Sequence, residues 1–333
     1  MMQAVQITQT NSLWEIRQIP IPEPKEGQVL IKIHASGLCG TDLHVHHGLM
    51  PVQLPCTPGH EPAGEIVKRG PGVIDFNVGD RVGVSWIQRG CGRCTTCQSK
   101  EPLYCPHSQT WKDLGGGMAE YMLAWADGCT LLPEDLSYIE AAPLFCAGYT
   151  IASGFHNGHP RPGDIVAVSG VGGLGHLAIQ YAKAKGHRVI AITGHSEKKQ
   201  VAKELGADLV VVPGDNMLSE IASFGGIDIL LHTGNASDRI TALLGAMNPE
   251  GRVVIMGIAE TPLIAHPFQL IHHQVSIIGS MQYKRSYLVD ILNLTAAQKI
   301  RPMIEVYSLD QLPDVVERLQ SGRVRFRAVV SFR

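Results

Sequence analysis

The feature that most constrains the fold is an apolar strand, a glycine-rich turn and an amphipathic helix in the run DIVAVSGVGGLGHLAIQYAKAKG. The turn has the spacing G-x-G-x-x-G, which between a strand and a helix is typical of a dinucleotide-binding loop. Gly170 suits a tight turn, Gly172 lets the backbone approach a pyrophosphate, and Gly175 permits close packing of the helix on the sheet. We expect a bound dinucleotide, rather than a glycine-rich turn without a ligand, at Gly170, Gly172, Gly173, Leu174 and Gly175.

Strand and helix patterns alternate in the second half of the chain. The expected strands are DIVAVSG, HRVIAIT, DLVVV, IDILLHT, GRVVIMG and QVSIIGS, with helical segments between them. Such crossovers predict an α/β fold with a doubly wound parallel sheet. In the first half, the runs VLIKIHA, PAGEIV, DRVGVSW and AEYMLA stand too close together for helical crossovers, which predicts a β-rich domain. The transition falls near residues 143–163.

The charge balance excludes several classes of function. The 333 residues include 28 Lys+Arg and 30 Asp+Glu, a formal net charge of −2, which offers no basic surface for nucleic acid. No run approaches the roughly 18 to 20 consecutive apolar residues of a membrane span, and the N-terminal segment lacks the pattern of a signal peptide. We therefore expect a soluble, cytoplasmic protein that binds neither nucleic acid nor a membrane.

Four of the eight cysteines lie close together in the run CGRCTTCQSKEPLYC. The spacing C-x2-C-x2-C-x7-C lets four thiolates surround one ion at Zn–S distances of about 2.3 Å. Redox-active disulfides or free thiols are the alternative, and a nucleic-acid-binding zinc ribbon lacks the surrounding basic and aromatic residues. The cluster predicts a structural zinc site with the ligands Cys91, Cys94, Cys97 and Cys105.

Two further segments, GLCGTDLHVHHG and PGHEPAGEIVKRGPGV, complete a set of motifs in which the chain resembles the zinc-containing medium-chain alcohol dehydrogenases. The resemblance runs nearly end to end. It implies a GroES-like, β-rich catalytic domain formed by residues 1–147 and 293–333, and a Rossmann domain formed by residues 148–292. It also implies two zinc ions per subunit and hydride transfer between an alcohol or aldehyde and NAD(P).

The resemblance assigns the ligands of a catalytic zinc ion. They are Cys39, His60 and Cys146, and this set leaves a fourth position open for water or substrate, as a catalytic site requires. Glu61 is expected either as an adjacent or transient ligand or as a nearby carboxylate that fixes an arginine or the backbone. Cys56 and Cys129 have no implied role and are interpreted as packing residues.

The resemblance also implies a proton relay from the substrate through the Thr41 hydroxyl and a cofactor ribose hydroxyl to His44. A histidine that titrates near neutrality suits this exit. The neighbouring His46 and His47 have no implied role and are expected to be exposed loop residues. Trp86, Leu49 and Trp111 are candidates to line the substrate pocket, with a plain core role as the alternative for Trp86.

The segment after the second Rossmann strand bears on the choice of cofactor. NAD enzymes usually place Asp or Glu there, on the ribose 2′-hydroxyl, whereas this chain has Thr193. We therefore predict a preference for NADP(H), with a solvated helix start that accepts either cofactor as the alternative. The residues expected at the 2′-phosphate are Thr193, His195, Ser196 and Lys198, and the resemblance adds Arg285 as a contact of the pyrophosphate.

These features favour a zinc-dependent alcohol dehydrogenase or aldehyde reductase with a small substrate. A zinc-free reductase of the same superfamily, of the quinone-reductase type, is disfavoured because Cys39, His60 and Cys146 are all present. A non-catalytic binding or structural role is disfavoured by the same ligand set. Relatives of this size are commonly tetramers or dimers, so we expect a homo-oligomer.

Overall fold

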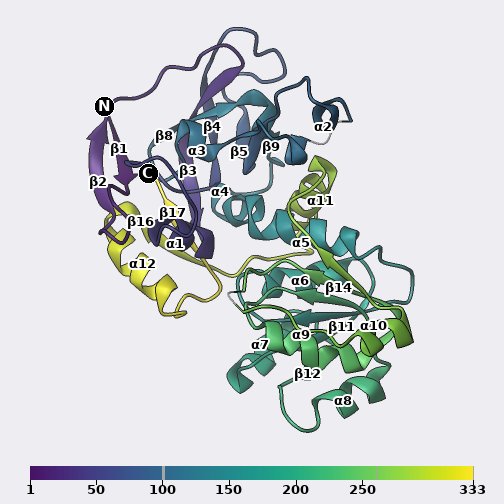
Figure 1. The fold of residues 1–333 in the computed structure, drawn as a ribbon. Coiled ribbons are helices and arrows are strands. Elements are labelled where there is room, and N and C mark those ends of the chain that lie inside the picture. Colours follow the sequence, from purple (N-terminus) through teal and green to yellow (C-terminus); the bar gives the residue numbers. More distant parts are fainter. Residues whose placement is uncertain (100–101, 260, 333) are drawn as a thin grey trace. The chain divides into compact units, whose positions relative to one another are not determined.

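The computed structural model describes residues 1–99, 102–259 and 261–332, and the chain forms two compact units (Figure 1). Unit 1 joins Met1–Cys146 to Pro302–Arg333, and unit 2 is Ala147–Arg301. The chain therefore returns from unit 2 to unit 1 after residue 301, and not after residue 292 as expected from the sequence. The physical reason is that α11 (Arg285–Ala296) is one continuous helix packed on α5 (Ala147–Asn157) of unit 2, so a boundary at 293 would cut it.

Unit 1 is built around a seven-stranded sheet in the order β16-β17-β3-β4-β5-β9, with β8 also paired to β3. All pairings are antiparallel except β16 with β17. The four strand patterns expected from the sequence are confirmed as β3, β4, β5 and β8. The strands of unit 1 are β1 (Met2–Gln6), β2 (Glu15–Ile19), β3 (Gln28–Leu38), β4 (Glu61–Arg69), β5 (Arg81–Val84), β6 (Ile87–Arg89), β7 (Gln109–Thr110), β8 (Tyr121–Trp125), β9 (Cys129–Leu131), β16 (Ile304–Ser308) and β17 (Arg327–Ser331).

Short helices lie between these strands. They are α1 (Gly40–His46), α2 (Thr95–Gln98), α3 (Trp111–Leu114), α4 (Tyr138–Ala141), the 3-10 turn η3 (Ala142–Phe145) and α12 (Leu312–Gln320). The sequence interpretation missed α1, although Cys39 caps it and Asp42 completes a reciprocal capping box. Ile31 and Ile66 of the sheet and Val315 of α12 are fully buried in one core, so the C-terminal return completes unit 1.

Unit 2 contains a six-stranded parallel sheet in the order β12-β11-β10-β13-β14-β15, which confirms the doubly wound fold. All six expected strands are present. They are β10 (Ile165–Ser169), β11 (Arg188–Ile192), β12 (Leu209–Val211), β13 (Ile227–His232), β14 (Met247–Ile255) and β15 (Ser276–Gly279). The helices of this unit are α5 (Ala147–Asn157), α6 (Gly175–Ala184), α7 (Lys199–Glu204), α8 (Met217–Phe224), α9 (Ser237–Leu243), α10 (Pro267–His273) and α11.

The parallel arrangement determines where a ligand of unit 2 can bind. The carboxyl ends of β10, β11 and β13 meet at one edge of the sheet, so the loops that follow these strands are neighbours. In open α/β sheets this edge is where nucleotides bind. Among the helices that the structure describes, none is both long and apolar enough to cross a membrane.

Candidate metal centres and cofactor loop

Three side chains of types that bind metals, from distant parts of the sequence, meet in unit 1. Cys39 follows β3, His60 precedes β4 and Cys146 follows η3. The Cys39 Sγ lies 3.3 Å from the His60 Nε2 and 3.9 Å from the Cys146 Sγ. Ligands around one tetrahedral zinc ion lie about 3.5–3.8 Å apart. These two distances are close to that spacing, and the third pair of donor atoms lies within 4.8 Å.

Asp42 holds this group together from the first turn of α1. Its Oδ2 accepts a hydrogen bond from the Cys39 backbone N–H at 3.0 Å. Its Oδ1 lies 3.2 Å from the His60 Nδ1 and accepts from the Gly59 N–H at 3.2 Å. Because Asp42 occupies Nδ1, the opposite ring nitrogen of His60 is directed toward the thiols, which is how carboxylates commonly orient metal-binding histidines.

Glu61 is fully buried beside the same group and forms an ion pair with Arg327 of β17. Its Oε1 lies 3.9 Å from the His60 Nε2, and all four donor atoms of Cys39, His60, Glu61 and Cys146 lie within 4.8 Å of one another. A Cβ at Gly37 would overlap the Glu61 carboxylate, so glycine is required there. The Glu61 Oε2 has no hydrogen-bond partner in the described part of the chain, which leaves it available to a cation.

The buried ionisable groups have shifted pKa values. A hydrogen bond from the Cys146 thiol holds the pKa of Cys39 well below its usual range, and the same bond, together with burial, raises the pKa of Cys146. Burial raises the pKa of Glu61 to about 7, against the opposing effect of Arg327. These shifts favour loss of the proton from Cys39 before Cys146, and thiolates are the form that binds metals.

The expected relay residues Thr41 and His44 lie on α1, three positions apart and both half-buried. Residues three apart share one face of a helix. The expectation that His46 and His47 are both exposed loop residues is wrong for His46, which ends α1 and is 8% exposed. Its Nδ1 accepts a hydrogen bond from the Trp14 indole at 3.1 Å, so it is part of the core, whereas His47 is exposed.

Two tryptophans flank the imidazole of His60. The ring centroid of Trp86 lies 5.1 Å from it and that of Trp111 6.4 Å, and the two indoles meet edge to face. Trp111 is 1% exposed, which makes it a core residue as well as a neighbour of the site. Leu49, the third candidate pocket residue, is 67% exposed.

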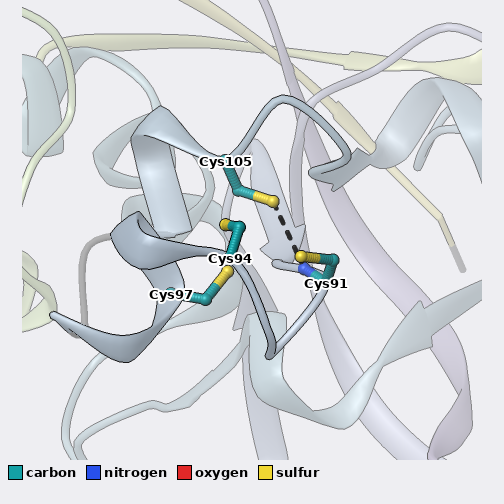
Figure 2. A group of neighbouring side chains, drawn as sticks. All are labelled: Cys91, Cys94, Cys97 and Cys105. Carbon is teal, nitrogen blue, oxygen red and sulfur yellow. Dashed lines mark hydrogen bonds between the residues drawn. The ribbon is translucent and has the colours of Figure 1, made fainter.

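The four cysteines of the local cluster also converge, as Figure 2 shows. They lie between β6 and β7, and their sulfur atoms are within 4.8 Å of one another. The Cys105 Sγ accepts hydrogen bonds from the backbone N–H groups of Cys91 at 3.3 Å and His107 at 3.4 Å. A hydrogen bond from Thr96 lowers the pKa of Cys94 to about 6. Backbone N–H contacts like those to Cys105 stabilise thiolate ligands.

The other two cysteines, Cys56 and Cys129, pack in or against the core of unit 1.

The glycine loop of unit 2 has the conformation that its sequence predicts. Gly170 follows β10 with a φ of +100°, a region that favours glycine. A Cβ at Gly175 would overlap the Gly170 carbonyl oxygen, whereas Gly172 faces open space. Gly173 and Leu174 lead into α6, with Leu174 as its first capping residue. The loop therefore leaves free space beside Gly172, and no side chain caps the start of α6, which suits a phosphate at the helix N-terminus.

The segment after β11 lies beside this loop. Lys198 donates to the Val171 carbonyl oxygen at 3.1 Å, and Thr193 is buried and accepts from the His195 N–H at 3.2 Å. His195 and Ser196 are exposed. Arg285 is exposed at the first residue of α11, so its contact with a pyrophosphate stays a prediction.

The sequence analysis missed two residues that contact the group of Cys39, His60 and Cys146. Asp42 had a detectable signal, because an acid three positions after a helix-capping residue completes a capping box. Arg327 had none, since it lies 266 positions from Glu61 and its strand only reaches the site through its pairing with β3.

Comparisons with known proteins agree with this geometry. Residues 25–134 match the family model of the alcohol dehydrogenase GroES-like domain, and residues 173–297 match that of the zinc-binding dehydrogenases. An alcohol dehydrogenase of Geobacillus stearothermophilus is 36% identical over 334 residues, covering 99% of both chains. The chain belongs to the zinc-containing medium-chain alcohol dehydrogenase family.

Solved structures of this family have the same fold. The alcohol dehydrogenase of Aeropyrum pernix superposes with a TM-score of 0.88 at 29% identity, covering 99% of this chain and all of that one. A candidate zinc-binding dehydrogenase of Sinorhizobium meliloti 1021, solved with NADP, gives a TM-score of 0.87 at 27% identity, covering 100% and 99% of the two chains. The expected family and fold class are confirmed.

Proposed function

We propose that this alcohol dehydrogenase uses a zinc ion held by Cys39, His60 and Cys146 to interconvert a small alcohol with its aldehyde or ketone. The observation that carries the proposal is the convergence of two sulfur atoms and one imidazole nitrogen at the spacing of zinc ligands. Three protein ligands leave a fourth position for the substrate oxygen. A zinc ion bound there supplies a Lewis acid that polarises this oxygen during hydride transfer.

The surrounding residues support this role in defined ways. Asp42 fixes the ring of His60 through Nδ1, so that its Nε2 is held toward the two thiols. Arg327 balances the charge of Glu61, which can then approach the ion without leaving a lone negative charge in the core. Thr41 and His44 face one side of α1, and we assign them the transfer of the alcohol proton toward solvent.

We assign a second zinc ion to Cys91, Cys94, Cys97 and Cys105. Four cysteine ligands fill a tetrahedron and leave no position for a substrate, so this ion has a structural role. Its effect is to hold the segment between β6 and β7, in which the described helix α2 has only four residues, against the rest of unit 1.

For the cofactor we propose NADP(H). The position after β11 where an acidic residue would repel a 2′-phosphate is Thr193, and Lys198 supplies positive charge beside the glycine loop. Trp86, next to His60 and half-buried, offers flat apolar surface to the substrate, and the buried Trp111 packs behind it. A homo-oligomeric state, as a tetramer or dimer, and a cytoplasmic location remain predictions from the resemblance and the composition.

Two measurements test the proposal. Metal analysis of the purified protein should find two zinc ions per chain, and removal of the more labile ion should abolish alcohol oxidation until zinc is added back. Initial rates with a panel of primary, secondary, aromatic and allylic alcohols should give a higher kcat/KM with NADP than with NAD. One zinc ion or none would contradict one of the two metal assignments, and equal or better rates with NAD would contradict the cofactor assignment.

A further inference from the structure

Arg239 lies at the edge of the parallel sheet where β10, β11 and β13 end. It belongs to α9, which follows β13, yet a Cβ added to Gly194, after β11, would lie only 3.2 Å from its guanidinium. Since β11 and β13 flank β10, their axes are about 9–10 Å apart. The Arg239 side chain therefore extends across the end of β10 toward the loop that begins at Thr193.

The guanidinium of Arg239 has no partner within residues 1–99, 102–259 and 261–332, where it takes part in no hydrogen bond and no ion pair. Other arginines of unit 2 are paired: Arg188 donates to the Phe224 carbonyl oxygen at 2.7 Å, and Arg252 pairs with Asp164. Arg239 is half-buried, so its charge is partly removed from water. A positive group in this position is suited to bind an anion.

The loop after β11, which Arg239 reaches at Gly194, carries groups of both charges, and Asp238 next to Arg239 in α9 adds an exposed carboxylate. Lys198 holds its ammonium at the Val171 carbonyl of the glycine loop, 3.1 Å away. The carboxylate of Glu197 lies 3.3 Å from the His195 Nδ1 and is 64% exposed. The loop after β11 thus has one cation, Arg239, at Gly194 and another, Lys198, at the glycine loop, while the carboxylate of Glu197 is held beside a histidine.

We propose that Arg239 binds the 2′-phosphate of NADP(H) and is a main determinant of cofactor specificity. This inference rests on the proposed preference for NADP(H), because the adenosine ribose of a dinucleotide lies at the end of the second strand of the sheet, here β11. A planar guanidinium can donate two parallel hydrogen bonds to a phosphate, whereas the 2′-hydroxyl of NAD gives it no charge to balance. Gly194 leaves the space in which the guanidinium lies.

Binding of two nucleotide fragments, adenosine 2′,5′-bisphosphate and adenosine 5′-monophosphate, tests the role of Arg239 without catalysis, since they differ only in the 2′-phosphate. Calorimetric titration of the intact, zinc-loaded protein should show tighter binding of the bisphosphate. In Arg239→Met this preference should fall by about tenfold or more, the effect of losing one charge-assisted hydrogen-bonded pair, while binding of the monophosphate stays the same. Arg239→Lys, which keeps the charge but loses the planar fork, should show an intermediate preference.

Arg188→Met is the matched control, because Arg188 begins β11 at the opposite end of the strand. It should bind both fragments as the wild type does. A wild type that prefers the bisphosphate together with an unchanged preference in Arg239→Met overturns the role of Arg239 and leaves the NADP(H) assignment intact. A wild type without any preference overturns the NADP(H) assignment, and the role of Arg239 with it. An equal loss in Arg188→Met would show a general charge effect and also overturn the inference.

Discussion

The two cysteine-containing sites of unit 1 are built in opposite ways. Cys91, Cys94, Cys97 and Cys105 come from one short segment, and three of them are half-buried. Cys39, His60 and Cys146 come from three separate strand and helix ends. The four-cysteine site is formed within one local loop, whereas the site of Cys39, His60 and Cys146 is assembled by the folded sheet.

The contacts around the ligands differ in the same sense. Local backbone N–H groups surround the Cys105 sulfur. At the other site, buried carboxylates from Asp42 and Glu61 contact the ligands, and Glu61 is balanced by Arg327. The comparison suggests that a site held by distant elements supports chemistry, because its geometry is fixed before the ion binds, while a local site supports stability.

The largest expected effect comes from Cys146→Ser. We expect the chain to lose one of two zinc ions and kcat/KM to fall at least about 1000-fold, because Lewis-acid assistance supplies several kcal/mol. Metal analysis and steady-state rates with the best alcohol measure both. Cys129→Ser is the control, since Cys129 is a buried cysteine of unit 1 outside both sites, and it should keep both ions and most activity. Full activity of Cys146→Ser would contradict the assignment of catalysis to the site of Cys39, His60 and Cys146.

Arg327→Met tests the buried ion pair between Arg327 and Glu61, which lies beside Cys39, His60 and Cys146 and not at the four-cysteine cluster. Removing one partner of a buried pair leaves the charge of Glu61 uncompensated, which costs about 3–5 kcal/mol in the free energy of unfolding. Urea unfolding followed by tryptophan fluorescence measures the loss. Arg323→Met removes a pair of similar length, 2.6 Å to Glu317, but with both side chains more than half exposed, so it should change stability little. Equal losses in both variants would contradict the structural importance of the buried pair.

Asp42→Asn tests whether positioning of a ligand matters. The amide keeps the shape of the carboxylate but not its charge, so the affinity of the site for zinc should fall by about 10–100-fold. Competition with a chelator measures the zinc affinity of each site. The ion at Cys39, His60 and Cys146 should be released more readily than in the wild type, and the ion of the four-cysteine cluster should be unaffected. Asp113→Asn is a close control, because Asp113 completes the same kind of capping box in α3 without touching a metal ligand. Similar zinc loss in both variants would assign the effect to helix capping.

The same contrast explains what the sequence could reveal. The cluster from Cys91 to Cys105 was predicted from spacing alone, because its geometry is local, and the six strands of unit 2 were predicted because each helical crossover leaves a periodic pattern. Cys39, His60 and Cys146 were assigned only through the family resemblance, since no spacing rule connects positions 107 residues apart. Arg327 and Arg239 reach Glu61 and Gly194 only through tertiary contacts, which the sequence pattern does not show.

Cys97→Ser should have the smallest effect on catalysis and so completes the comparison. Three remaining cysteines bind zinc weakly, so the chain should retain one ion, while kcat/KM per folded molecule stays within about twofold because no reacting group depends on this loop. The released segment between β6 and β7 should become sensitive to limited proteolysis, and the midpoint of thermal unfolding should fall by about 2–4 °C for each kcal/mol lost. Ser99→Ala, in the same segment but outside the ligand set, should leave the zinc content and the proteolysis rate unchanged. If Cys97→Ser instead abolished activity in a folded, one-zinc protein, the four-cysteine cluster would serve the reaction itself, and the division between a catalytic and a structural site would be wrong.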